Sequence, residues 1–233
     1  MYHHVTDNPP GTPVELESRL IVTRAEFARQ LEYLRCAGYA SITVSQLFDG
    51  MYNGAPMPPK PIILTFDDGY ADAFTDALPL LQQYGFRGTF GIITGYVGAQ
   101  PYVSWPQVVA MADAGMEIIS HSVTHEDFNK SSDEIVREQA VLSKAALEEH
   151  LGRPVEFLTY PSGEPFYRGT EERQRRVVEI LREAGYRGAL AVRNSMVQDP
   201  ANPYALNRVR VNGGEDLKGF AENIFGPPPG SGC

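Results

Sequence analysis

The chain has 233 residues, of which 42% are hydrophobic, and it carries a formal net charge of −9. This length suits one large core, and an α/β barrel of this size is ordinarily a single domain. The acidic balance argues against non-specific nucleic-acid binding and against a polyanionic substrate, and no apolar run approaches the roughly 20 residues that a membrane helix needs.

Short apolar runs alternate with amphipathic stretches along the chain. The runs predict strands at Met1–Val5, Pro61–Asp67, Gly88–Ile93, Glu117–Ser120, Val155–Tyr160, Gly188–Val192 and Leu206–Val211. The stretches between them predict helices at Arg24–Ala37, Val44–Gly50, Tyr70–Tyr84, Pro106–Ala114, Asp133–His150, Glu171–Ala184 and Glu215–Ile224. Such alternation is typical of a parallel α/β sheet or barrel, and about seven units indicate a barrel short of the regular eight.

Helix boundaries carry their own signals. Capping-box spacing occurs at Thr23 with Glu26, Thr43 with Gln46, Ser104 with Gln107 and Ser131 with Glu134. No repeat or linker divides the chain, so we expect one domain over residues 1–226 and a flexible, Pro- and Gly-rich tail over residues 227–233. Cys36 falls in a predicted helix and Cys233 is the last residue, and we do not expect them to form a structural disulfide.

Polar residues follow the predicted strands at the points where they end. In parallel α/β folds the functional site forms at the carboxyl ends of the strands. The residues found at these positions are His3, Asp67, Asp68, His121 with His125, Ser162 and Arg208. They come from different strands and meet only if the chain closes into a barrel.

Two adjacent carboxylates, Asp67 and Asp68, end an apolar strand. Like charges side by side, together with burial, raise carboxylate pKa values, and a divalent cation would make the pair tolerable. Successive residues of a strand point to opposite faces, so one aspartate can bind metal while the other acts as a base. The alternative is a turn or a helix cap that follows the strand.

Two histidines stand four positions apart, at His121 and His125. If this segment turns helically, their side chains share a face, which suits two imidazoles on one metal ion. With a carboxylate they form a facial set that leaves positions open for water and substrate. The alternative is a pair of satisfied or exposed histidines.

Three motifs, TFDDGY at 65–70, HSVTH at 121–125 and YPSG at 160–163, resemble those of the polysaccharide deacetylases, carbohydrate esterase family 4, also called the NodB homology domain. The resemblance spans residues 1 to about 212. It implies an α/β fold, a distorted (β/α) barrel of about seven parallel strands, and metal-assisted removal of an N- or O-acetyl group from a sugar.

The same resemblance implies the role of each residue. Asp68, His121 and His125 match the metal ligands; zinc is the expected ion, and other first-row metals suit the same donors. Asp67 matches the catalytic base, which takes a proton from a water acidified by the metal. Ser162 stands where a backbone N–H donates to the oxyanion.

Two departures from the family pattern need an explanation. Thr159 stands where the third motif commonly opens with an arginine, and Arg208 can reach in from the last strand instead, unless it is an ordinary surface residue. The family's late histidine, its general acid, is also absent, since the histidines are His3, His4, His121, His125 and His150.

One branch, resembling the deacetylases of poly-N-acetylglucosamine, opens with a Tyr-His strand whose histidine takes that role. His3 matches it as general acid, and we expect His4 to point away. The alternative for His3 is a packed N-terminal histidine. We expect His150, at the end of a long helix, to be solvated.

We therefore expect a metal-dependent deacetylase of an N-acetylated glycan, such as poly-N-acetylglucosamine, a chitin-like chain or peptidoglycan. The resemblance favours an extracytoplasmic protein, and we expect a monomer with no nucleic-acid partner. The alternatives are an O-acetyl esterase on a xylan-like polysaccharide and an inactive glycan-binding domain. A serine esterase would need a G-x-S-x-G elbow, which the YPSGE stretch does not provide.

Overall fold

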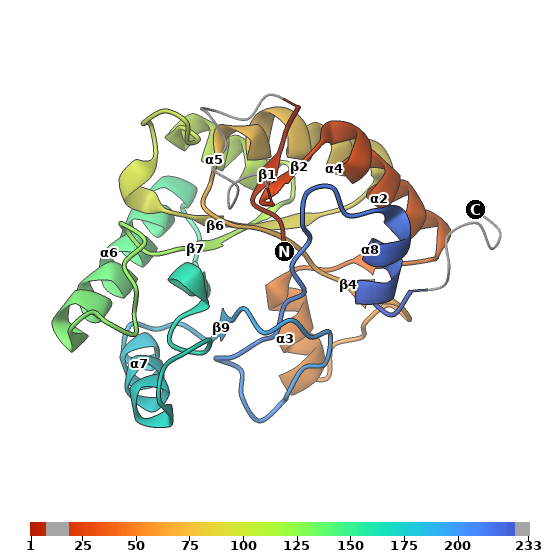
Figure 1. Ribbon diagram of the computed structural model, residues 1–233. Helices are drawn as coiled ribbons and strands as arrows, with labels where there is room; N and C mark the ends of the chain where they lie inside the picture. Colours follow the sequence, from red (N-terminus) through yellow and green to blue (C-terminus); the bar gives the residue numbers. More distant parts are fainter. Residues whose placement is uncertain (8–18, 227–233) are drawn as a thin grey trace.

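The computed structural model describes residues 1–7 and 19–226, and the tail predicted at 227–233 lies outside the described residues. Five parallel strands form the main sheet in the order β5–β6–β7–β8–β9. They are β5 (Leu64–Phe66), β6 (Gly88–Ile92), β7 (Glu117–Ser120), β8 (Phe157–Thr159) and β9 (Gly188–Leu190). The sheet curls into a half-barrel with helices packed around it (Figure 1), so the predicted α/β barrel-like fold in one domain is confirmed.

Seven α-helices were expected and the described residues contain them. They are α2 (Arg24–Cys36), α3 (Val44–Tyr52), α4 (Leu78–Tyr84), α5 (Trp105–Asp113), α6 (Asp133–Leu151), α7 (Glu171–Glu183) and α8 (Leu217–Asn223). The capping boxes at Thr23, Thr43 and Ser104 are present. At α6 the cap is Ser132 and not Ser131, because the Ser132 side chain accepts the hydrogen bond from Ile135 N–H.

Several predicted strands are shorter than expected. The run at 61–67 divides into β4 (Pro61–Ile62), which pairs with β3 (Ala40–Ser41), and β5 in the main sheet. The predicted strand Leu206–Val211 is wrong: this segment makes one isolated bridge, between Leu206 and Leu190 of β9. On its other side this segment bonds to the N-terminus through Met1 N–H to Val209 O and Val211 N–H to Met1 O.

The N-terminal segment closes the open side of the half-barrel. β1 (His4–Val5) pairs with β2 (Ile21–Val22), and Tyr2 bridges to Phe66 of β5. The amino group of Met1 donates to Val209 O at 2.7 Å, and Val211 N donates to Met1 O at 3.0 Å. Figure 1 shows the N-terminus near the centre of the molecule, beside the segment around residue 210.

Aromatic packing holds this segment in place. The ring of Tyr2 stacks on Phe66 at 5.2 Å between centroids, and Phe66 stacks on Phe90 of β6 at 4.6 Å. Tyr2 also meets Phe27 of α2 edge to face at 5.1 Å. Aromatic pairs of this kind add to the stability gained from buried area, so the position of His3 and His4 is set by the core on one side of them.

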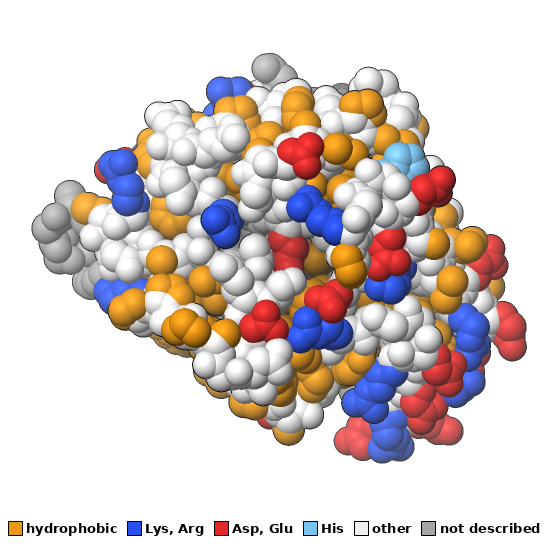
Figure 2. All heavy atoms as spheres, turned by 180° about the vertical axis from the view of Figure 1, so that it is seen from behind, with side chains coloured by type: hydrophobic (Ala, Val, Ile, Leu, Met, Phe, Trp, Pro, Cys, Tyr) orange, Lys and Arg blue, Asp and Glu red, His pale blue; other side chains and the backbone are white. Residues whose placement is uncertain are grey.

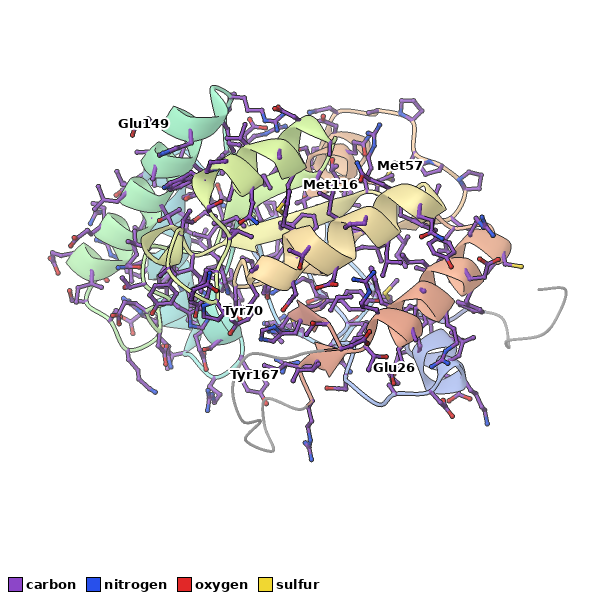
Figure 3. All side chains as sticks on the ribbon, turned by 90° about the horizontal axis from the view of Figure 1, so that it is seen from above. Glu26, Met57, Tyr70, Met116, Glu149 and Tyr167 are labelled. Carbon is purple, nitrogen blue, oxygen red and sulfur yellow. The ribbon has the colours of Figure 1, made fainter. Side chains whose placement is uncertain are left out.

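The two ends of the parallel strands face opposite sides of the molecule. In Figure 3, Tyr70 and Tyr167, which follow β5 and β8, lie on one side, and Met57 and Met116, which precede β4 and β7, lie on the other. The predicted site residues belong to the side of Tyr70. Among residues 1–7 and 19–226, no helix combines the length and the apolar character needed to cross a membrane.

Charged side chains of both signs share the outer surface. On the face shown in Figure 2, Lys and Arg side chains lie among Asp and Glu side chains, most densely at the corner formed by α6 and α7. Ion pairs such as Arg137–Glu183 and Arg173–Asp133 connect these two helices. Exposed pairs contribute little to stability, and they leave no single-sign patch at this corner.

Cys36, the last residue of α2, is disulfide-bonded. The expectation that the cysteines stay unpaired is therefore wrong. Helix α8 packs on α2, and Gly226 lies against Tyr33 of α2, a neighbourhood that spacing along the sequence did not reveal. The other cysteine, Cys233, lies outside the described residues.

Candidate active site

The turn after β5 presents both aspartates at the carboxyl end of the sheet. Asp68 has φ of 74° and Gly69 has φ of 76°, both in the left-handed region. A Cβ on Gly69 would lie 3.2 Å from Ile92 Cδ1, so glycine suits both the backbone conformation and the space. This turn leaves Asp67 buried in the half-barrel and Asp68 partly exposed.

Asp68, His121 and His125 come together as predicted for a metal site. Oδ1 of Asp68 lies 3.1 Å from Nε2 of His121 and 3.6 Å from Nε2 of His125. Potential ligand atoms of the three residues all lie within 4.8 Å of one another. Nδ1 of His121 is 2.8 Å from the carbonyl oxygen of Thr159, so Nδ1–H donates there and Nε2 is left to bind a cation.

The loop that carries the two histidines is not helical. Ser122 and His125 have φ of 67° and 61°, and His125 N–H donates to Ser122 Oγ at 2.9 Å. The rings of His121 and His125 meet edge to face with centroids 4.8 Å apart. The helical turn, which was only a condition for the two side chains to share a face, is absent, yet the two imidazoles lie beside one carboxylate.

The three residues of this cluster shift one another's pKa values. Burial alone would raise the pKa of Asp68, but the hydrogen bond and charge of His121 hold it below its usual range. Burial alone would lower the pKa of His121, but Asp68 and Asp67 raise it above its usual value. Burial and the charge of His121 lower the pKa of His125. One carboxylate and two imidazoles therefore offer a donor set that suits a divalent first-row metal.

Asp67 forms a buried ion pair with Arg208. Nη1 of Arg208 donates to Asp67 Oδ1 at 2.7 Å, and both side chains are 5% exposed. Burial alone would raise the pKa of Asp67, but the Arg208 guanidinium holds it well below its ordinary range. The backbone N–H of Asp67 donates to Tyr2 O at 3.0 Å. Asp67 is therefore held ionised and fixed in direction.

Arg208 is not a surface residue. Besides Asp67 it donates to Ala191 O at 3.0 Å, to Thr159 Oγ1 at 2.7 Å and to Thr65 Oγ1 at 3.4 Å. Thr159, which stands where an arginine was expected from the motif, thus holds the arginine that comes from elsewhere in the chain. The structure brings Arg208 to Asp67 from the segment after β9.

His3 lies beside the two aspartates. Its Nδ1 atom is enclosed and has no hydrogen-bond partner within the protein. Burial lowers its pKa to about 4, against the opposing effect of the charges of Asp67 and Asp68. The imidazole of the free protein is therefore neutral at pH 7.

His4 faces a different set of partners. Its Nδ1 lies 2.6 Å from Oδ2 of Asp72, and its ring stacks on Tyr70 with centroids 3.7 Å apart. Asp72 Oδ1 also accepts from Val5 N at 3.2 Å. His4 and Asp72 are both buried, so together they hold β1 against the turn that follows β5.

Ser162 and His150 lie apart from the residues described so far. Ser162 has φ of 54° in the turn η3 (Pro161–Gly163), which follows β8, and its exposed side chain makes no hydrogen bond to the other site residues. His150, at the end of α6, is exposed as expected, and its ring also stacks on Trp105 with centroids 3.7 Å apart.

Two positioning contacts were missed in the sequence. Asp72 was assigned to a helix, although an acid four residues after Asp68 and facing a His-rich first strand was a visible signal. Gln139 of α6 is buried and bonds to the histidine loop. Its signal was a polar residue on a helix face that is otherwise largely apolar.

A family model described as polysaccharide deacetylase matches residues 54–189, more than half of the chain. The chain belongs to the polysaccharide deacetylase family. The chain is 25% identical over 224 residues to the putative polysaccharide deacetylase YxkH of Bacillus subtilis, covering 96% of this chain and 74% of that protein.

A second relative carries a more specific name. The chain is 25% identical over 138 residues to the poly-beta-1,6-N-acetyl-D-glucosamine N-deacetylase of Escherichia coli K12, covering 52% of this chain and 20% of that enzyme. Among solved structures, the Streptococcus pyogenes deacetylase PplD in complex with acetate superposes with a TM-score of 0.82 at 23% identity, covering 96% and 95% of the two chains. This last likeness supports the fold.

Proposed function

We propose that this deacetylase is a metal-dependent hydrolase that removes the acetyl group from an N-acetylated glycan. The observation that carries the proposal is the cluster of Asp68, His121 and His125 beside the buried Asp67–Arg208 pair. Three protein ligands leave coordination positions open for water and substrate, as hydrolytic metal sites require. Zinc is the metal we expect.

Asp68, His121 and His125 would hold the ion. A divalent ion in such a site polarises the acetyl carbonyl and lowers the pKa of a bound water toward ~7. Asp67 is the base in this proposal. It is ionised because Arg208 holds its pKa low. A carboxylate of low pKa is a weak base, so it can take a proton only from a water that has already been made acidic.

His3 is proposed as the general acid that protonates the leaving nitrogen. Its pKa of about 4 in the free protein means that the proton is not stored there at pH 7. His3 must therefore receive it during turnover, and the proton that Asp67 removes from water is the nearest source. Because Nδ1 is enclosed by the protein while the residue as a whole is partly exposed, we assign the proton transfer to the other ring nitrogen, Nε2.

Ser162 is proposed as the oxyanion donor through its backbone N–H. Donors preorganised toward developing charge are commonly worth about 2.7–4 kcal/mol in transition-state stabilisation. The left-handed backbone at Ser162 turns the peptide directly after β8, at the same edge of the sheet as the other residues.

For the substrate we propose a poly-N-acetylglucosamine-like chain, supported by the similarity to the E. coli poly-beta-1,6-N-acetyl-D-glucosamine N-deacetylase. Since the chain spans only a fifth of that enzyme, the whole protein's substrate is part of the proposal, as is action outside the cytoplasm. The proposed alternative, an O-acetyl esterase on a xylan-like polysaccharide, would use the same residues without needing a general acid for an amine.

The test is acetate release from chitin oligomers, poly-N-acetylglucosamine, peptidoglycan and acetylated xylan, measured before and after treatment with a chelator and again after adding zinc. We expect release from an N-acetylated glycan that the chelator abolishes and zinc restores. Release that ignores the chelator would contradict the metal proposal, and no release from any glycan would indicate a binding domain.

A further inference from the structure

Helix α6 buries a polar residue on the face that packs against the sheet. Gln139 is 8% exposed, and the same helix face buries Val136, Ala140 and Leu147. A glutamine in this position costs stability unless its amide is fully hydrogen-bonded. Its place in the core therefore calls for an explanation other than packing.

The amide of Gln139 directs all of its hydrogen bonds to one loop. Oε1 accepts from Val123 N at 2.9 Å and from Thr124 N at 2.8 Å. Nε2 donates to Thr124 Oγ1 at 3.0 Å. Both lone pairs of the oxygen are thus used, on two successive peptide groups that lie between the proposed metal ligands His121 and His125.

The loop needs this support because its backbone is unusual. Ser122 and His125 both have positive φ, a conformation that non-glycine residues adopt only where the surroundings fix it. On the other side, Thr94 N donates to Ser122 O at 3.1 Å and Gly95 N donates to Val123 O at 2.8 Å. Gln139 holds the loop from its other side by accepting from the N–H groups of Val123 and Thr124.

The two histidines depend on the loop to different degrees. His121 directly follows β7, and its ring is fixed by the carbonyl of Thr159. His125 stands at the far end of the loop, and its backbone N–H bonds only to Ser122 Oγ within the loop itself. A change in loop shape therefore moves His125 more than His121.

We propose that Gln139 is a positioning residue that sets the shape of the loop at 121–125 and so directs the His125 imidazole toward the metal. The inference rests on the proposed function, because it takes His125 to be a ligand. Without the Gln139 oxygen, the part-buried N–H groups of Val123 and Thr124 lose their acceptor, and the loop loses the contact that fixes its shape.

Three variants test this role. Gln139→Met keeps the side-chain volume and removes the acceptor, whereas Gln139→Glu keeps an oxygen for both N–H groups. Leu147→Ala is the matched control, because it weakens the packing of the same helix face and touches neither the loop nor the site. Zinc affinity is measured by competition with a chromophoric chelator, and amide hydrogen exchange at Val123 and Thr124 is measured on metal-free protein.

We expect Gln139→Met to weaken zinc binding by about 10–100-fold, as for other residues that support metal ligands from outside, and to speed exchange at both amides. Gln139→Glu should bind zinc within a few-fold of the wild type. Leu147→Ala should lower the melting temperature and leave zinc affinity unchanged.

Equal zinc affinity in Gln139→Met and the wild type would overturn the inference, even if the variant melts earlier. A wild-type protein that binds no zinc would instead overturn the proposed function. In that case the exchange measurement still tests Gln139. Unchanged exchange at Val123 and Thr124 in Gln139→Met would show that Gln139 does not set the shape of the loop.

Discussion

The two sides of the site are built in different ways. The proposed metal side stands on β5 and β7, which belong to one continuous parallel ladder through β6. The proposed acid–base side brings His3 and Arg208 from segments joined to the sheet by isolated bridges and by backbone bonds between Met1 and residues 209–211. A continuous backbone ladder carries the first side, whereas a few backbone bonds and the side-chain hydrogen bonds of Arg208 hold the second.

This difference indicates where each side is sensitive to mutation. A ladder tolerates the loss of one side chain, so ligand changes on the metal side should remove chemistry and leave the fold intact. On the other side Arg208 connects Asp67, Thr159 and Ala191, so a change there should affect stability and chemistry together.

The largest effect is expected for the double variant His121→Ala, His125→Ala. Removing both imidazoles leaves one carboxylate, which should abolish stoichiometric zinc binding and all metal-dependent acetate release. Elemental analysis of the dialysed protein and circular dichroism measure metal and fold. Stoichiometric zinc in a folded double variant would end the ligand assignment.

Next comes Asp67→Asn, which we expect to lower turnover by ~10²–10⁴-fold, the usual contribution of a positioned acid–base group. The variant should still bind zinc, because the carboxylate serves as base and not as ligand. Steady-state acetate release and zinc titration of the same sample check both points. A loss of less than about tenfold would point to another base.

His3→Ala should lower turnover on an N-acetyl substrate by at least ~10²-fold. An activated ester, whose leaving group needs no proton, should be affected far less. Comparing the two substrates at equal metal content measures the difference. Equal losses on both would show that His3 has a structural role and not the role of an acid.

Arg208→Met should change both the pH profile of activity and the stability of the protein. With the guanidinium gone, burial raises the pKa of Asp67, so the acid limb of the pH profile of kcat/KM should move to higher pH. Breaking a buried pair typically costs about 3–5 kcal/mol. Because the pKa of Asp67 is depressed in the native wild type, its stabilising effect is complete above roughly pH 4 and is lost at lower pH.

The stability difference between the wild type and Arg208→Met should therefore be largest near neutrality and shrink on acidification, as followed by urea unfolding at several pH values. A difference independent of pH would mean that the arginine contributes by packing alone. Arg24→Met is a suitable control, because its exposed pair with Asp76 should contribute little.

The smallest effect is expected for His4→Ala. Asp72 would lose its 2.6 Å partner but keep Val5 N–H, which should cost about 1–3 kcal/mol of unfolding free energy. Turnover should stay within a few-fold on both substrates. A loss of turnover as large as that of His3→Ala would mean that the strand presents the other histidine to the substrate.

The sequence predicted the ladder side of the molecule well, because β5 to β9 are apolar runs that end in turn residues. It also identified Asp67, Asp68, His121 and His125 from two motifs. It did not predict that residues 206–211 lack a ladder or that Ser122 and His125 adopt positive φ, since both depend on neighbours distant in the sequence. The contact of Arg208 with Asp67 was raised only as an alternative, because side-chain reach is not encoded in spacing.

The bond between Met1 and Val209 joins groups 208 positions apart in the chain. Contacts of such separation form late, since the long loop between them must close first. During synthesis the segment with His3 leaves the ribosome early, yet Arg208 follows only when nearly the whole domain has been made. The nascent chain is therefore expected to assemble the proposed metal ligands long before Arg208 reaches Asp67, so the proposed base becomes oriented only when the segment after β9 docks.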